Sequence, residues 1–146
     1  MKLPIEVLQQ IHQMLNAIPF MKSLPQKDIE ELAYQLNLRH FSKGEAIIHE
    51  GEPGKIFYLV TKGTVGVYKK SFFGRKKIAE LGRGDFFGEM ALIEDIPRTA
   101  SVIGEEDGEM YTLSRHAFEK ILLANPEIGD LIRSTASQRK KSQKTS

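Results

Sequence analysis

The chain has 146 residues, 40% of them hydrophobic and 27% charged, with no cysteine and with 21 Lys or Arg against 19 Asp or Glu. A chain of this length buries enough apolar surface to fold without a disulfide or a structural metal, so we expect one globular domain over residues 1–137. Because cysteine is absent, a disulfide framework, a thiol nucleophile and a zinc–thiolate site are excluded, and a cytoplasmic location is expected.

Two amphipathic helices are predicted within residues 1–37. Apolar residues recur at spacings of three and four over 5–18, and Pro4 suits a first helical turn. A second apolar stripe begins after Ser23 and Gln26, which have the spacing of a capping box. The first helix could pack on its own domain or on a partner, which leaves a homodimer open.

Short β-rich runs separated by glycine-containing turns occupy residues 38–113. Turn signals at intervals of roughly 8 to 12 residues are typical of an antiparallel sandwich or barrel. No apolar run approaches the roughly 20 residues of a membrane span, so none is predicted. The expected strands are 38–41, 46–50, 56–61, 64–70, 76–81, 99–104 and 109–113.

Two adjacent phenylalanines, Phe72 and Phe73, precede Gly74 at the expected tip of a hairpin, and three basic residues follow. One interpretation is an exposed apolar patch that contacts a partner. The alternative is that one ring folds back onto the sheet.

A glycine-rich segment interrupts the β pattern at residues 82–102 and leads into a short helix-competent stretch over 89–93. The first backbone N–H groups of such a turn lack intrahelical acceptors, and they bind anions such as phosphate. Arg98 could add a planar charged fork for phosphate oxygens. Glu89, which only accepts hydrogen bonds when ionised, could hold a sugar hydroxyl.

Helical spacing returns over 114–137, where Ser114 is a predicted N-cap and Asn125-Pro126 precedes a last helix. Four basic residues then lie among the last nine positions, and without them 17 basic residues face 19 acidic ones, a net charge of −2. We expect residues 138–146 to form a disordered basic tail. A body so nearly neutral lacks the charge of a DNA-binding fold, and sequence-specific DNA binding is not expected.

Two motifs in the glycine-rich segment are distinctive: Gly88-Glu89-Met90-Ala91-Leu92, and then Pro97-Arg98-Thr99-Ala100. Together they resemble the phosphate-binding cassette of the cyclic nucleotide-binding domain family, and the resemblance extends over roughly residues 20 to 130. The resemblance implies a mainly β fold. Residues 38–113 would form an antiparallel, jelly-roll-like β-roll, which includes the cassette at 82–102. Helices would flank the roll at 1–37 and 114–137.

The resemblance also implies roles for individual residues. Arg98 would pair with a cyclic phosphate, Glu89 would accept from the ribose 2′-hydroxyl, and Thr99 would offer its hydroxyl to phosphate or base. On the last helix, Leu131 and Ile132 are candidates to cap the base. The implied ligand-binding residues are Phe87, Gly88, Glu89, Met90, Ala91, Pro97, Arg98, Thr99 and Ala100.

The implied function is that of a stand-alone sensor that binds cAMP or cGMP, moves its C-terminal helices and acts on an unidentified protein effector. Thr99 suits either ligand, and cAMP is favoured. No cofactor or metal is expected, because the four histidines include no pair with metal-ligand spacing. Three alternatives remain: a ligand-free interaction module, a small phosphodiesterase, and nucleic-acid binding by the tail. The enzyme is disfavoured because no nucleophile lies near the acidic residues.

Overall fold

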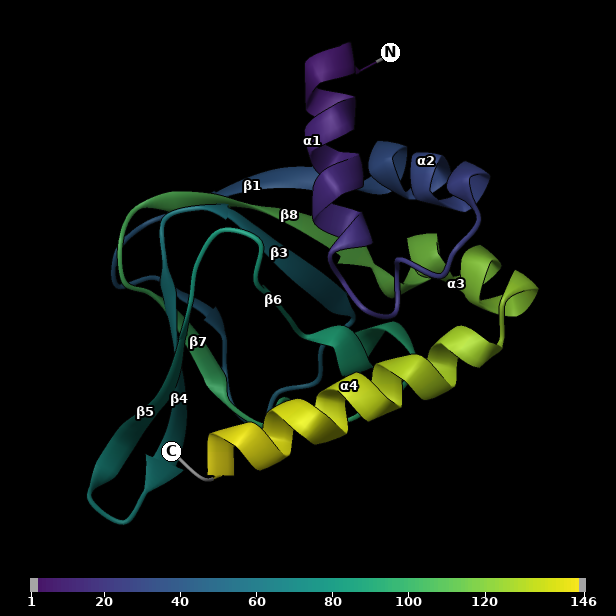
Figure 1. Cartoon of the computed structure of the whole chain (residues 1–146). Helices are drawn as coiled ribbons and strands as arrows, with labels where there is room; N and C mark the ends of the chain where they lie inside the picture. The colour runs from purple at the N-terminus through teal and green to yellow at the C-terminus, as the bar shows by residue number, and fades with distance from the viewer. Residues whose placement is uncertain (1–2, 145–146) are drawn as a thin grey trace.

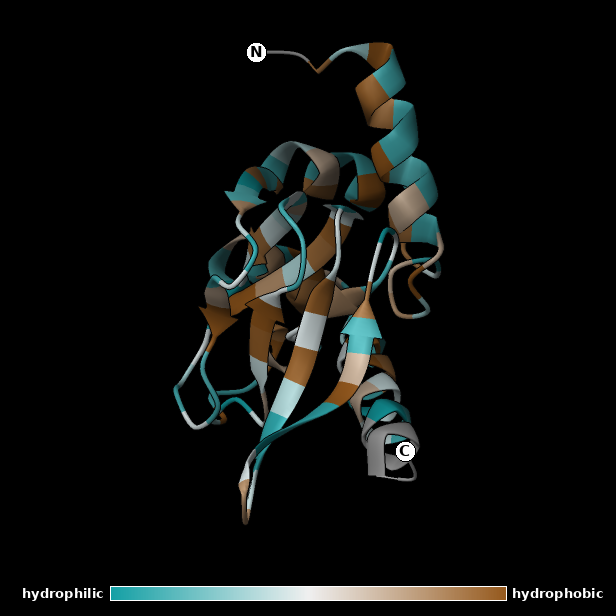
Figure 2. Ribbon diagram, turned by 90° about the vertical axis from the view of Figure 1, so that its left-hand side faces the viewer, coloured by the Kyte–Doolittle hydropathy of each residue, from teal (hydrophilic) through white to brown (hydrophobic). Residues whose placement is uncertain are grey.

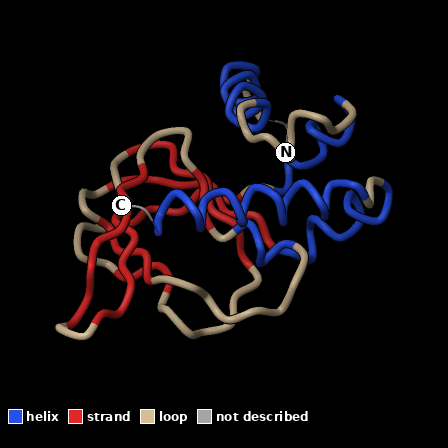
Figure 3. The backbone as a smooth tube through the Cα atoms, turned by 60° about the horizontal axis from the view of Figure 1, so that its bottom comes forward, coloured by secondary structure: helices blue, strands red, loops and turns tan. Residues whose placement is uncertain are grey.

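The computed structural model describes residues 3–144, with side chains through residue 139, as a β-roll with helices gathered at one end (Figures 1 and 3). The helices are α1 (Ile5–Asn16), α2 (Gln26–Gln35), the 3-10 turn η1 (Glu89–Leu92), α3 (Arg115–Ala124) and α4 (Glu127–Lys144). The strands are β1 (Asn37–Phe41), β2 (Ala46–Ile48), β3 (Ile56–Lys62), β4 (Val65–Ser71), β5 (Gly74–Leu81), β6 (Phe86–Phe87), β7 (Ser101–Gly104) and β8 (Gly108–Ser114).

Two four-stranded antiparallel sheets form the roll, with strand orders β1-β8-β3-β6 and β2-β7-β4-β5. The predicted fold class is therefore confirmed. Strand β6 is an addition, because a two-residue strand is too short to leave a periodic signal. It pairs Tyr58 with Phe87 and Leu59 with Phe86, which places the start of the cassette beside β3.

Strand β3 joins two hydrophobic cores, because four consecutive residues of it are buried on alternating faces. Tyr58 and Val60 lie in the core of the roll. Phe57 and Leu59 belong to a second core between the roll and the helices. The helical layer is thus fixed to the strand against which the cassette folds.

The helix caps agree with the sequence in part. The expected cap of α3 is confirmed, since the amide of Ala117 donates to the Ser114 hydroxyl at 3.1 Å. The expected capping box of α2 is wrong. That helix follows Pro25, and no side chain caps it, because proline at this position already holds the backbone conformation that leads into a helix.

The end of the chain differs most from expectation. Helix α4 continues through Lys144, whereas a disordered tail was predicted from residue 138. Arg139 accounts for the difference, because its guanidinium bonds to the Glu89 carboxylate at 2.9 Å and lies 4.7 Å from the centre of the Phe86 ring. These contacts hold the helix against the roll. Residues 145–146 lie outside the described residues.

None of the described helices is both long enough and apolar enough to cross a membrane.

Phe20, in the loop after α1, tests how the two layers depend on each other. Its side chain is fully buried, and its ring meets Phe57 and Phe86 edge-on at 5.9 and 5.7 Å. We expect Phe20→Ala to lower the free energy of unfolding by about 3–5 kcal/mol in urea denaturation, because it leaves a cavity. The exposed Phe72→Ala is the control and should change it by about 0.5 kcal/mol or less. Equal losses would contradict the assignment of Phe20 to the core.

Candidate functional site

A cavity of about 360 Å³ lies between the cassette, the inner face of one sheet and α4. This volume is within the range of roughly 300–1,000 Å³ that is typical of small-ligand sites. Lining residues are Ile48, Val67, Lys69, Phe87, Gly88, Glu89, Met90, Ala91, Ile96, Pro97, Arg98, Thr99, Ala100, Val102, Arg133, Ala136, Ser137 and Arg139.

Arg98 is half-buried in the wall of this cavity, where its Nη2 donates to the Ile56 carbonyl at 2.8 Å. Burial lowers the pKa of its guanidinium, and the nearby Tyr58 and Glu89 oppose that shift. Among the described residues, Arg98 takes part in no ion pair, so its charge is compensated only by a neutral carbonyl. A half-buried cation of this kind favours a bound anion.

Glycine makes the room that Arg98 occupies. A Cβ on Gly54 would lie 2.2 Å from Arg98 Nε. Gly88, whose φ of 79° is left-handed, lies so close to β3 that a Cβ would stand 2.9 Å from the Ile56 carbonyl oxygen. A side chain at position 54 would therefore displace the Arg98 guanidinium, whereas Gly88 is required both for close approach to the backbone of β3 and for its left-handed conformation.

Glu89 begins η1 and is 7% exposed. Its carboxylate accepts the hydrogen bond from Arg139 of α4; the Glu89 side chain of this pair is 9% exposed and the Arg139 side chain 24%. In this arrangement the residue expected to bind ribose already holds the last helix.

The turn that follows Gly88 uses one of its own backbone amides. The amide of Ala91 donates to the Gly88 carbonyl at 3.1 Å, so it is occupied within η1. The amides of Glu89 and Met90, at the start of the turn, have no intrahelical acceptor. An anion beside Arg98 would meet these two first.

All nine cassette residues of the predicted site line the cavity. Their contact with a ligand stays a prediction. The two candidates to cap a base do not line it: Ile132 is fully buried in the helical core, and Leu131 borders a separate depression beside Pro19 and Phe86. Ile132 shares a face of α4 with Ala136 and Arg139, which line the cavity, but it lies one to two turns nearer the start of the helix, where that face packs into the helical core.

Four polar lining residues were not found from the sequence: Lys69, Arg133, Ser137 and Arg139. A signal existed for Arg139, because Ile132, Ala136 and Arg139 continue the spacing of four and three beyond residue 137. Arg133 pairs with Glu94 at 3.0 Å, so α4 is bound to both ends of η1. With Lys69 and three arginines against Glu89, the cavity carries an excess of positive charge.

Arg115 fixes the far end of the cassette to α3. Its guanidinium donates to the carbonyls of Ala91 and Glu94 at 2.7 and 2.5 Å and pairs with Asp95 at 2.5 Å. The hydrogen bond from Arg115 lowers the pKa of the Asp95 carboxyl. A displacement of η1 would therefore move α3 as well as α4.

Comparison with known proteins agrees with this geometry. The family model of the cyclic nucleotide-binding domain matches residues 38–125. A cAMP-dependent protein kinase regulatory subunit from Hypocrea atroviridis is 38% identical over 108 residues, which cover 74% of this chain and 22% of the relative. The regulatory domain of Toxoplasma gondii PKA, solved with cAMP, superposes with a TM-score of 0.77 at 25% identity, over 82% of this chain and 46% of that one.

A third comparison limits what the fold alone implies. The regulatory subunit of a cAMP-independent protein kinase A from Trypanosoma brucei superposes with a TM-score of 0.75 at 28% identity, over 91% of this chain and 48% of that one. Proteins that differ in their relation to cAMP thus share this fold. The fold alone therefore does not determine the ligand.

The match over more than half of its length shows that this chain belongs to the cyclic nucleotide-binding domain family. The sequence predicted this family, and the relatives most similar to the chain include protein kinase A regulatory subunits. The chain spans between 22% and 28% of the length of the curated relatives it matches.

Alanine substitutions at Gly88 and Gly84 distinguish the cost of a steric clash from the cost of a strained backbone conformation. Both have positive φ, but a Cβ on Gly84 would meet open space. We expect Gly84→Ala to lower the free energy of unfolding by about 1–2 kcal/mol through its conformation alone. Gly88→Ala should cost about 1–3 kcal/mol more, because the new methyl meets the backbone of β3. Urea denaturation of both variants measures the difference, and equal losses would show that the cassette does not need this close approach.

Proposed function

We propose that this domain is a cyclic nucleotide sensor with cAMP as its favoured ligand. The observation that carries the proposal is the half-buried Arg98 guanidinium, without an ionic partner among the described residues, in the wall of a cavity that the buried Glu89 also lines. One ligand class that satisfies both groups joins an anionic phosphate to a hydroxylated sugar. The cAMP-dependent relatives support the same choice.

The cyclic phosphate would form charge-assisted hydrogen bonds with Arg98 and with the free amides at the start of η1. The ribose 2′-hydroxyl would donate to Glu89. The base would then lie toward Thr99, which is exposed at the cavity edge, and toward the face of α4 that carries Arg133 and Ser137. Thr99 offers a hydroxyl to either purine, so a comparison of cAMP with cGMP belongs in every titration.

The proposed link between binding and output is competition for Glu89. Arg139 now donates to this carboxylate, and a ribose hydroxyl at the same oxygen atoms would displace it. Loss of that ion pair would free the last turns of α4 from Phe86 and from the cassette. A ligand shifts such an equilibrium only by binding one arrangement more tightly than the other, which this competition provides.

The output would then pass to an unidentified protein effector, in a cytoplasmic setting, through the altered position of α4. A homodimer through α1 stays open. The second candidate function is a ligand-free interaction module, which the similarity to the regulatory subunit of a cAMP-independent kinase favours. Calorimetric titration of nucleotide-free protein with cAMP and cGMP separates the two, because the module would bind neither.

Arg98→Ala is the direct test of nucleotide binding. Loss of a charge-assisted phosphate contact should weaken cAMP binding by at least about 2 kcal/mol, or roughly thirtyfold in Kd, in isothermal calorimetry. Arg83→Ala is the matched control, because the Arg83 side chain is exposed and bonds only to the Thr61 carbonyl outside the cavity. Unchanged affinity in Arg98→Ala would contradict the proposed function.

Arg139→Ala tests the competition. Without the ion pair, the arrangement in which α4 occupies the Glu89 carboxylate is less populated. The affinity for cAMP should therefore rise by about threefold to tenfold. Arg39→Ala removes a comparable pair with Glu45, at 3.0 Å and remote from the cavity, and should leave affinity unchanged. A fall in affinity would show instead that Arg139 contacts the nucleotide.

A further inference from the structure

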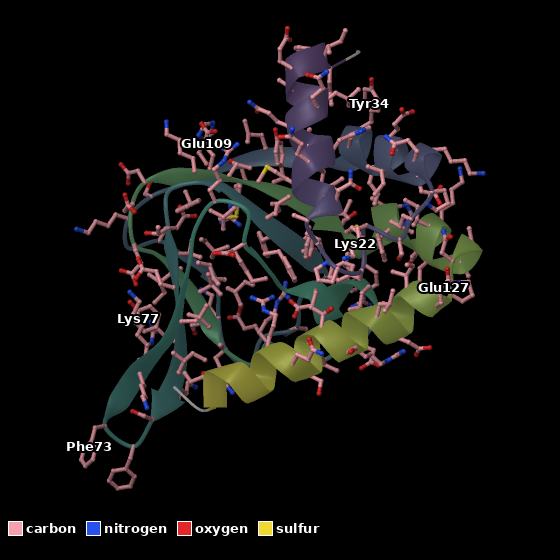
Figure 4. The ribbon with its side chains drawn as sticks, in the orientation of Figure 1. Lys22, Tyr34, Phe73, Lys77, Glu109 and Glu127 are labelled. Carbon is pink, nitrogen blue, oxygen red and sulfur yellow. The ribbon has the colours of Figure 1, made fainter. Side chains whose placement is uncertain are left out.

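The tip of the β4–β5 hairpin exposes both of its phenylalanines. Phe72 is 94% and Phe73 93% exposed, and the two rings contact each other edge-on with centroids 5.1 Å apart. Neither ring folds back on the sheet, so one of the two interpretations of this pair is excluded. The hairpin projects from the roll, and Phe73 points away from it (Figure 4). Its apolar tip stands beyond the polar part of the strands (Figure 2).

The turn itself does not require these residues. Ser71 pairs with Gly74, and Gly74 supplies the positive φ of 114° that reverses the chain. Residues at such tips are commonly Gly, Asn, Asp, Pro or Ser. Two large apolar side chains here add nothing to either core, and they remain in water unless something outside the domain receives them.

The strands behind the tip carry an unusual arrangement of charge. Lys69 lies opposite Lys76, and Lys70 lies opposite Arg75, so two successive cross-strand pairs are like-charged. Such pairs repel and destabilise a hairpin. Lys70, Arg75 and Lys76 are exposed, and within residues 3–139 they form no ion pair. Only Lys77, further along, is neutralised, by Glu80 and Glu105.

Lys70, Arg75 and Lys76 therefore place positive charge directly behind the protruding apolar tip.

We propose that this hairpin docks on an anionic lipid bilayer. Phe72 and Phe73 would enter the boundary between headgroups and acyl chains, and Lys70, Arg75 and Lys76 would remain among lipid phosphates. The tip is a convex projection that has no groove of its own for a peptide, whereas a bilayer accepts isolated rings at any position. An anionic headgroup layer also relieves the repulsion between the like-charged pairs. Apolar insertion combined with a basic cluster is the two-signal arrangement that gives stable peripheral binding.

A unique fluorescent reporter is available, because the chain has no tryptophan. Phe73→Trp in the full chain should show a blue shift, and quenching by brominated lipid, with vesicles of phosphatidylcholine and phosphatidylserine. Vesicles of phosphatidylcholine alone should cause neither the blue shift nor the quenching. Added salt should reverse both changes in the mixed vesicles. Leu123→Trp, on α3 at a position that is 84% exposed, is the matched reporter and should not respond.

Flotation with the same vesicles measures affinity without a reporter. Phe72→Ala/Phe73→Ala and Lys70→Glu/Arg75→Glu should each weaken binding by at least about tenfold. Lys62→Glu, an exposed lysine at the end of β3, should have a smaller effect. Equal binding to neutral vesicles, no binding to either vesicle, or full binding by the double alanine variant would each overturn the proposal. If the protein binds neither vesicle, a protein partner becomes the remaining candidate for contact with the tip.

Discussion

The location of Arg98 constrains the whole site. Its backbone is clamped on both sides, because its amide donates to Glu52 and its carbonyl accepts from Gly51, each at 2.8 Å. Its guanidinium passes over Gly54 to the Ile56 carbonyl of β3. The loop before β3 and the end of the cassette are thereby joined around one side chain. A cation fixed in this way needs little further ordering when an anion arrives, which is how a preformed site limits the cost of binding.

The helices are attached to the same short segment from three directions. Arg115 of α3 holds the end of η1, while Arg133 and Arg139 of α4 hold Glu94 and Glu89. Each contact is ionic or charge-assisted, and Glu89, Arg133 and Arg139 line the cavity, where a charged ligand alters the balance. The apolar contacts of Ile132 and Phe118 belong to the helical core. Movement of α4 would thus be controlled by few polar contacts, with the packed core as a pivot.

The sequence predicted the roll and the cassette well because both depend on local signals. Glycine turns mark most strand boundaries, and Gly88, Glu89 and Arg98 belong to a motif of fixed spacing. The end of α4 was missed because a basic, polar composition predicts disorder, and only a partner distant in sequence, Glu89, makes this segment helical. That Leu131 and Ile132 cap a base stays a prediction; neither lines the cavity, because tertiary packing and not local spacing decides which turns of a helix reach it.

Strand β4 connects the cavity to the hairpin tip, yet it keeps the two separate. Val67 and Lys69 line the cavity, whereas the residues from Lys70 onward point into solvent. The register slips between Val67 and Tyr68, and this irregularity lies where the strand leaves the sandwich to form the free arm. β7 pairs with β4 only as far as Tyr68, and beyond it the Glu50 carboxylate still accepts from the Lys70 amide at 3.0 Å, while the residues from Ser71 to Lys77 are exposed. Ligand binding and surface docking therefore depend on different residues of one strand, and either can be lost without the other.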